Sequence, residues 1–196
     1  MAPVIARDSL WTLEAYARER SVFRARVMAH KKQRTLHLGK HMTLLFEDEL
    51  TMRYQIQEML RIERIFEEKE IRDELAAYNP LIPDGHNWKA TLLLEYADPA
   101  ERIHWLTRLQ GIEHRIWMKV GDEPVMRPVA DEDMPCDNGD KTSAVHFLRF
   151  EVDVRSRQAL RAGAELQAGV DHPAYTVSGQ PCFGGLRQSL LRDLVE

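Results

Sequence analysis

The second half of the chain alternates apolar and polar residues with the two-residue period of a β-strand. Residues 90–96 are instead apolar on both faces, which is typical of a strand in the centre of a sheet. In the first half, two short runs are separated by Gly39 and Lys40 and predict a hairpin. The predicted strands cover residues 34–38, 42–46, 90–96, 112–120, 143–152 and 165–170.

Helical periodicity dominates two long segments. Asp8 or Ser9 can cap a helix from residue 10 to about residue 30, because either side chain accepts a hydrogen bond from a free amide at a helix N-terminus. Residues 50–78 contain no proline or glycine and place apolar side chains on one face, which predicts one long helix. Shorter helices are predicted at 99–110, with Asp98 as cap, and at 183–195.

The order of these elements favours an α+β fold. Because several strands follow one another directly, we expect a largely antiparallel sheet packed against a long central helix and an N-terminal helix. The chain has 196 residues, 44% of them hydrophobic, which is enough to bury the core of a single domain spanning residues 1–196. Residues 128–140 are rich in acids and proline and predict an exposed loop.

Composition limits the function classes. A net charge of -4 argues against general nucleic-acid binding, and no apolar run is long enough to cross a membrane. Arg7 and Asp8 stand where a secretory signal would be apolar, so we expect a cytoplasmic protein with neither a nucleic-acid nor a membrane partner. Cys136 and Cys182 lack a Cys-x-x-Cys spacing and are predicted to be reduced thiols. The oligomeric state stays open.

Three histidines share predicted strand faces with apolar residues. His114, His146 and His172 each fall on the face that should point toward the core. Glu63 falls near the middle of the apolar face of the predicted long helix, where an unpaired carboxylate would be costly. Imidazole and carboxylate together favour a borderline transition metal, so these four side chains predict a site for iron, manganese or zinc.

Other interpretations of the same residues are open. Arg20 or Arg24 of the first helix could neutralise Glu63 instead of a metal, and basic residues of that helix could hold a carboxylate or phosphate. A single histidine on an apolar face is also common as a core residue that has its own hydrogen bonds. The sequence lacks the glycine-rich and nucleophile motifs of dinucleotide-binding proteins, P-loop proteins and serine hydrolases, so no nucleotide cofactor is predicted.

Five segments carry a resemblance to a known family. They are LFEDELTMRYQIQEMLRIERI (residues 45–65), YNPLIP (78–83), GIEH (111–114), VHFLRF (145–150) and DHPAY (171–175). These segments resemble a bacterial family of unknown function and spread over nearly the whole chain. Members of that family are often encoded beside a rubrerythrin and an iron-sulfur protein of the heterodisulfide-reductase type, so the resemblance implies a link to iron or peroxide metabolism. The family assigns no roles to the matching positions, which include Gln55, Glu58, Arg61, Glu63, Asn79, His114, His146, His172 and Tyr175.

Three functional hypotheses follow. The first is a metal-binding protein linked to redox or peroxide metabolism, in which Glu63 and the three histidines bind the metal and Arg20 and Gln55 orient them. The second is a non-catalytic accessory protein that docks on a rubrerythrin or iron-sulfur partner through its early basic surface. The third is an anion-binding enzyme in which Glu63 or His172 acts as acid or base. The further candidates for orienting or anion-binding roles are Arg24, Glu58, Arg61, Asn79 and Tyr175.

Overall fold

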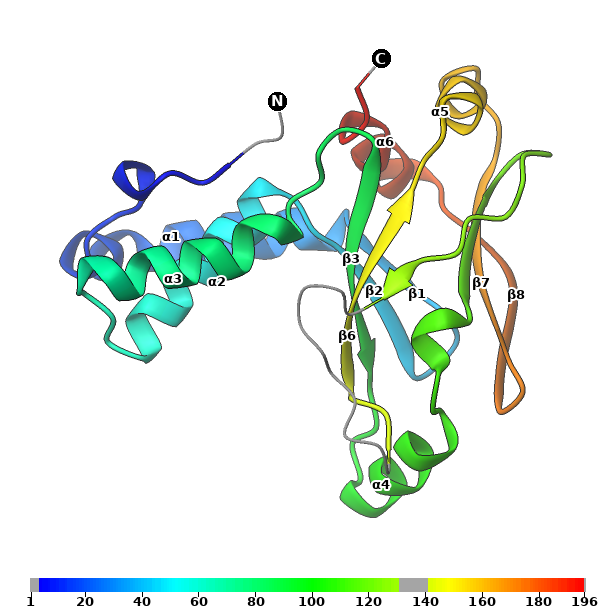
Figure 1. Cartoon of the computed structure of the whole chain (residues 1–196), viewed down its shortest axis with the longest axis horizontal. Coiled ribbons are helices and arrows are strands. Elements are labelled where there is room, and N and C mark those ends of the chain that lie inside the picture. The colour runs from blue at the N-terminus through cyan, green and yellow to red at the C-terminus, as the bar shows by residue number, and fades with distance from the viewer. Residues whose placement is uncertain (1–3, 131–140, 196) are drawn as a thin grey trace.

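The fold is α+β and is built from two antiparallel sheets and a group of helices beside them (Figure 1). The structure is a computed structural model and describes residues 4–130 and 141–195. The helices are α1 (Leu13–Lys32), α2 (Glu49–Ile62), α3 (Glu68–Tyr78), α4 (Pro99–Arg108), α5 (Val154–Arg161) and α6 (Gly184–Arg192), with 3-10 turns η1 (Arg7–Ser9), η2 (Asn79–Leu81) and η3 (Ile112–His114). The strands are β1 (Thr35–His37), β2 (Met42–Phe46), β3 (Asn87–Leu94), β4 (Ile116–Val120), β5 (Val129–Ala130), β6 (Val145–Glu151), β7 (Leu166–His172) and β8 (Tyr175–Pro181).

The two sheets pack face to face around the main core. The larger sheet has the strand order β1-β2-β3-β6-β5 and the smaller has the order β4-β7-β8. Because side chains alternate along a strand, one face of the larger sheet carries Trp88, Leu92 and Phe150 into the core, where residues such as Met118 and Leu166 of the smaller sheet meet them. The other face of the larger sheet, here called the polar face, carries Lys89, Thr91 and Arg149 together with apolar side chains such as that of Phe147.

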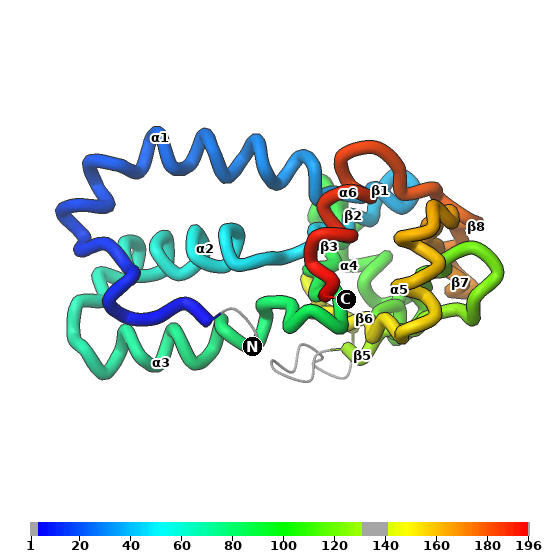
Figure 2. The backbone as a smooth tube through the Cα atoms, turned by 90° about the horizontal axis from the view of Figure 1, so that it is seen from above, coloured from blue at the N-terminus to red at the C-terminus, as the bar shows by residue number. Residues whose placement is uncertain are grey.

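The helices α1, α2 and α3 form a lobe beside the sheets (Figure 2). Tyr16 and Phe23 of α1 are buried with Tyr54 of α2, and a second cluster joins Ile56 of α2 to Ile71 of α3. These helices pack mainly on one another, whereas the prediction placed two helices directly against the sheet. The side chain of β6 that packs against this helical cluster is that of Phe147.

The predicted helix over residues 50–78 is wrong, because the chain forms two helices there. The helix α2 ends at Ile62, and Arg64 takes a left-handed conformation with φ of 55°. The amide of Ile65 then donates to the carbonyl of Leu60 at 2.9 Å, which closes the helix end in the manner of a Schellman motif. Glycine usually occupies the left-handed position of such a motif, and arginine here gave no sequence signal for the end of the helix.

Most other predicted elements are confirmed with shifted bounds. The hairpin of β1 and β2 and the Asp98 cap of α4 form as predicted. The first helix begins later, with Thr12 as its cap in place of Asp8 or Ser9. The predicted strand over residues 112–120 starts only at Ile116, because η3 precedes it. Elements α5 and β8 were not predicted, and most of the predicted 128–140 loop, including Cys136, lies outside the described residues.

Among the residues that the structure describes, no helix has the length and apolar character that crossing a membrane requires.

Candidate functional site

The structure does not bring the four predicted metal ligands together. Glu63 is exposed at the end of α2 in the helical lobe, whereas the three histidines lie in or beside the sheets. His114 belongs to η3 rather than to a strand, and its side chain is 64% exposed. His146 and His172 are buried as predicted, but they lie on strands of different sheets. The prediction of Glu63 and His114 as core residues is therefore wrong.

The buried histidines have ordinary polar neighbours. Nε2 of His146 lies 2.8 Å from the hydroxyl of Thr142 and 3.1 Å from the carbonyl of Ser143. Nε2 of His172 lies 3.2 Å from the carbonyl of Gln110, and its Nδ1 accepts a hydrogen bond from the main-chain amide two residues further on. These bonds are what a buried imidazole needs for its own stability.

A carboxylate that the sequence analysis overlooked lies close to two of the histidines. Glu113 is buried, with Oε1 at 3.4 Å from Nε2 of His114 and Oε2 at 3.9 Å from Nε2 of His146. Within residues 4–130 and 141–195, however, no group of three or more His, Cys, Asp or Glu side chains is placed to hold a metal ion. Metal binding therefore stays a prediction without a defined ligand set.

The predicted orienting residues of the helical lobe mostly hold that lobe together. Arg20 of α1 and Arg61 of α2 both bind the carboxylate of Glu58. One predicted pairing joined Arg20 to Glu63. In the structure Arg20 binds Glu58 instead. Arg24 lies exposed on α1. Arg20, Glu58 and Arg61 form a structural ion-pair network that joins α1 to α2.

The remaining predicted orienting residues are likewise engaged in the fold. The side-chain amide of Asn79 makes two hydrogen bonds with the main chain of Ile5, which fastens the N-terminal segment to the end of α3. The hydroxyl of Tyr175 donates to the carbonyl of Leu38, which joins β8 to the turn after β1. Gln55 is half-buried on α2. The contacts of Asn79 and Tyr175 account for these two side chains within the fold.

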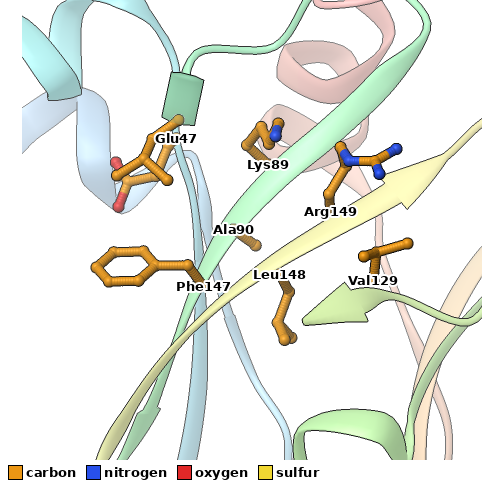
Figure 3. Close-up of a pocket in the computed structure, with 8 residues that line it drawn as sticks. Glu47, Lys89, Ala90, Val129, Phe147, Leu148 and Arg149 are labelled. Carbon is orange, nitrogen blue, oxygen red and sulfur yellow. The ribbon is translucent and has the colours of Figure 1, made fainter. Parts of the chain in front are cut away.

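A pocket on the polar face of the larger sheet combines charged and apolar side chains. Lys89 of β3 and Arg149 of β6 are directly opposite each other in the sheet register, and Val129 of β5 is opposite Arg149 on the other side. The ring of Phe147, also on β6, adds an apolar wall. Figure 3 shows Glu47 and Phe147 on one side of this pocket and Lys89 and Arg149 on the other.

The pairing of Lys89 with Arg149 is an unusual feature of the sheet. Like charges that face each other across a strand pair repel, so such a pair is normally avoided. Arg149 also makes an ion pair with the carboxylate of Glu151 at the end of the same strand. Two cations placed side by side at a pocket are well suited to bind an anion, because carboxylate and phosphate oxygens accept several charge-assisted hydrogen bonds.

Glu47 supplies the second unusual group of this pocket. It directly follows β2 and is only 4% exposed. Its main-chain amide donates to the carbonyl of Lys89 at 2.8 Å, and the guanidinium of Arg34 donates to its main-chain carbonyl at 2.9 Å. The backbone at Glu47 is thus fixed from two sides, and this holds the carboxyl group in the protein interior.

The carboxyl group of Glu47 is only half satisfied. The hydroxyl of Thr91 donates to Oε1 at 2.6 Å, whereas Oε2 is buried without a hydrogen-bond partner among the described residues. Burial raises the pKa of Glu47, because a charged carboxylate is poorly stabilised away from water, and the nearby threonine hydroxyls offset this only in part. A protonated carboxyl group would carry its hydrogen on Oε2, since Oε1 already accepts, and would offer a donor to a bound oxygen.

This pocket could not be predicted from the sequence because its residues are far apart in the chain. The usable signal was a single charge inside each of two apolar runs, Lys89 in NWKATLLL and Arg149 in VHFLRF. Strand alternation places both charges on the face opposite the core, but only the pairing register makes them neighbours.

The fold and this pocket define an α+β protein with a buried carboxyl group beside a pair of cations. The chain belongs to a family of proteins of unknown function, DUF3501, whose family model matches residues 4–194. It is similar to a protein from Burkholderia pseudomallei K96243 whose crystal structure was described as that of a novel protein of unknown function. The two share 51% sequence identity with a TM-score of 0.94, over 98% of this chain and 100% of the other. A search among curated proteins found no match.

Proposed function

We propose that this protein binds a small anionic metabolite in the pocket of Glu47, Lys89 and Arg149. The observation that carries the proposal is the direct cross-strand pairing of Lys89 with Arg149 beside a buried carboxyl group. A ligand with a carboxylate or phosphate group would place negative charge next to both cations at once. Binding would therefore gain charge-assisted contacts from two cations instead of one.

Glu47 is proposed to recognise a second polar atom of the same ligand. With Oε1 engaged by Thr91, Oε2 can donate to a carbonyl or hydroxyl oxygen whenever the carboxyl group is protonated, and burial favours that form by raising the pKa of Glu47. Phe147 and Leu81 give the pocket apolar walls, and its enclosed space is small, so a ligand would contact these groups from the rim. The class of ligand is therefore a small oxygenated organic acid or a phosphate ester, and Glu47 is placed to act as a proton donor toward it.

Thermal unfolding with a panel of anions tests this proposal. The probes are inorganic phosphate, acetate, malonate, succinate and glycerol phosphate at millimolar concentration. At least one should raise the unfolding midpoint of the wild-type protein, because a ligand that binds only the folded state stabilises it by mass action. The double variant Lys89→Met/Arg149→Met should lose that response. Lys119→Met is the matched control, since Lys119 is a half-buried strand lysine of the smaller sheet.

Two further variants separate the role of Glu47. Glu47→Gln keeps an acceptor for Thr91 and a donor in place of the carboxyl hydrogen, so binding should persist. Glu47→Leu removes both and should weaken binding by about tenfold or more, the value of a hydrogen bond within a charged site. No midpoint shift with any probe, or equal loss in Lys119→Met, would contradict the proposal.

The link to redox or peroxide metabolism stays a prediction from the family resemblance. Metal content can be measured on untagged protein after incubation with iron, manganese and zinc. Docking on a rubrerythrin or iron-sulfur protein can be tested by co-purification from the native host at low salt, where charge-led contacts are strongest.

A further inference from the structure

A second hollow lies in the helical lobe and shares no lining residue with the sheet pocket. It is lined by the segment before α1, by α1 itself and by the first turns of α2, including Trp11, Phe23, Arg26, Leu50, Arg53 and Gln57. We propose that this hollow is a binding site for a carboxylate that carries an aromatic or flat apolar group. The proposal rests on a buried amide, an aromatic wall and a cation that meet there.

The buried amide is that of Gln57. Its residue is 1% exposed, and its Oε1 accepts a hydrogen bond from the amide of Trp11 at 2.8 Å. This bond fixes the orientation of the side chain, since only the oxygen can accept from an N–H group. The opposite atom, Nε2, is then buried without a partner in the described part of the chain. An unsatisfied buried donor is costly and is rare in folded proteins, so a ligand oxygen is a natural partner for it.

The aromatic wall comes from Trp11 and Phe23. Their rings meet edge to face, with centroids 5.0 Å apart and planes at 89°. Phe23 is buried, whereas Trp11 is 38% exposed, so part of a large apolar ring remains in contact with water. Covering that ring would release ordered water and would add a favourable aromatic contact for a flat ligand.

The cation is Arg26. Arg53 is engaged by Glu49 and by both the carbonyl and the hydroxyl of Ser9, so its charge is already compensated. Arg26 is exposed, and no ion pair or hydrogen bond involves it among residues 4–130 and 141–195. The hollow therefore has one uncompensated positive charge among its exposed lining residues, and one of its buried lining residues carries an unsatisfied neutral donor. A carboxylate that uses these two groups and rests its apolar body against Trp11 matches this arrangement.

The test uses aromatic acids and their neutral counterparts. Benzoate, 3-phenylpropionate and indole-3-acetate are titrated while the tryptophan fluorescence and the unfolding midpoint are followed, with benzamide and 3-phenylpropionamide as neutral probes. At least one acid should bind in the millimolar range or tighter, and at least about tenfold more tightly than its amide, because the acid adds a charge-assisted hydrogen bond. Saturable quenching should disappear in Trp11→Leu if the ligand covers this ring.

Two site variants and two controls decide the assignment. Arg26→Ala should weaken binding of the acid by about tenfold, whereas Arg24→Ala, an equally exposed arginine of the same helix, should leave binding unchanged. Gln57→Glu keeps the acceptor for Trp11 but replaces the donor with a negatively charged oxygen, so it should abolish binding. Lys89→Met should have no effect, which separates this site from the sheet pocket. The inference is overturned if no acid binds, if acids and amides bind equally, or if Arg24→Ala acts like Arg26→Ala.

Discussion

Glu58 in the helical lobe and Glu47 in the sheet pocket are both largely buried, but their surroundings affect them in opposite directions. Glu58 receives two bonds from Arg20, at 2.7 and 2.8 Å, and another from the hydroxyl of Tyr16 at 2.7 Å. Its pKa is lowered to about 2, chiefly by the hydrogen bond from Arg20. The pKa of Glu47 is raised instead, because burial outweighs the bonds that its carboxyl group accepts.

The difference teaches how to separate structural charges from candidate functional ones. A carboxylate whose oxygens are all bonded stabilises the fold and has no free capacity for a ligand. A buried carboxyl group with one unmatched oxygen weakens the fold unless something else binds it. By this criterion Glu58 ties α1 to α2, and Glu47 is a candidate for a binding role.

Arg34 gives the largest expected effect, because it is a deeply buried charge with every donor matched. All five of its N–H groups donate, to the carbonyls of Phe46 and Glu47, to Ser189 and twice to Asp193. Arg34→Met should lower the free energy of unfolding by roughly 3–5 kcal/mol, since Asp193 loses its cation in the interior. Urea unfolding at pH 7 measures this loss in the free energy of unfolding. A loss of less than about 1 kcal/mol would show that a buried charge with every donor hydrogen-bonded need not stabilise the fold.

Glu58→Gln should have the next largest effect and a characteristic pH dependence. Because folding lowers the pKa from 4.5 to about 2, the stabilisation is complete above pH 4.5 and is lost as the pH falls toward 2. The variant should lose roughly 1–2 kcal/mol at pH 7, a value reduced by the partial solvation of Arg20 and Arg61. Denaturant unfolding from pH 2 to 7 should show the two proteins converging at low pH. A constant difference across that range would contradict the assignment.

Glu47→Gln should change stability less and in the opposite direction. A carboxyl group whose pKa rises on folding makes its full contribution to the free energy of unfolding below its ordinary pKa of 4.5. That contribution is lost as the pH rises through the pKa of the folded protein. The neutral amide avoids this loss, so the variant should be more stable than the wild-type protein by roughly 1 kcal/mol at pH 8. The difference in the free energy of unfolding between the variant and the wild-type protein should become smaller toward pH 4. A variant that is less stable at pH 8 would show that Glu47 is ionised and partnered in the folded protein.

The fold could be predicted largely because strand alternation and helix caps are local signals. The hairpin of β1 and β2 and the Asp98 cap of α4 follow from residues next to one another. The end of α2 could not be predicted, since an arginine occupies the left-handed position. The division into two sheets also depends on long-range pairing, which no local pattern records.

The candidate site could be predicted only in part. His146 and His172 were placed correctly in the interior because period-two alternation determines the face of a strand residue. Glu63 was misplaced because the helical period was extended past the real end of α2. Lys89 and Arg149 could not be grouped with the buried carboxyl group, since their neighbourhood follows from the register of β3 with β6.

Glu63→Ala should have the smallest effect and serves as the reference for the comparison. Glu63 is an exposed carboxylate just after α2, so its charge is solvated in the folded and unfolded chain alike. Removing it should change the free energy of unfolding by less than about 0.5 kcal/mol, as is usual for surface substitutions. The measurement is urea unfolding beside Glu58→Gln and Glu47→Gln under the same conditions. A loss of several kcal/mol would place Glu63 in a buried ion pair or metal site and would return the metal hypothesis to first place, because only an interior partner makes a lone carboxylate so costly to remove.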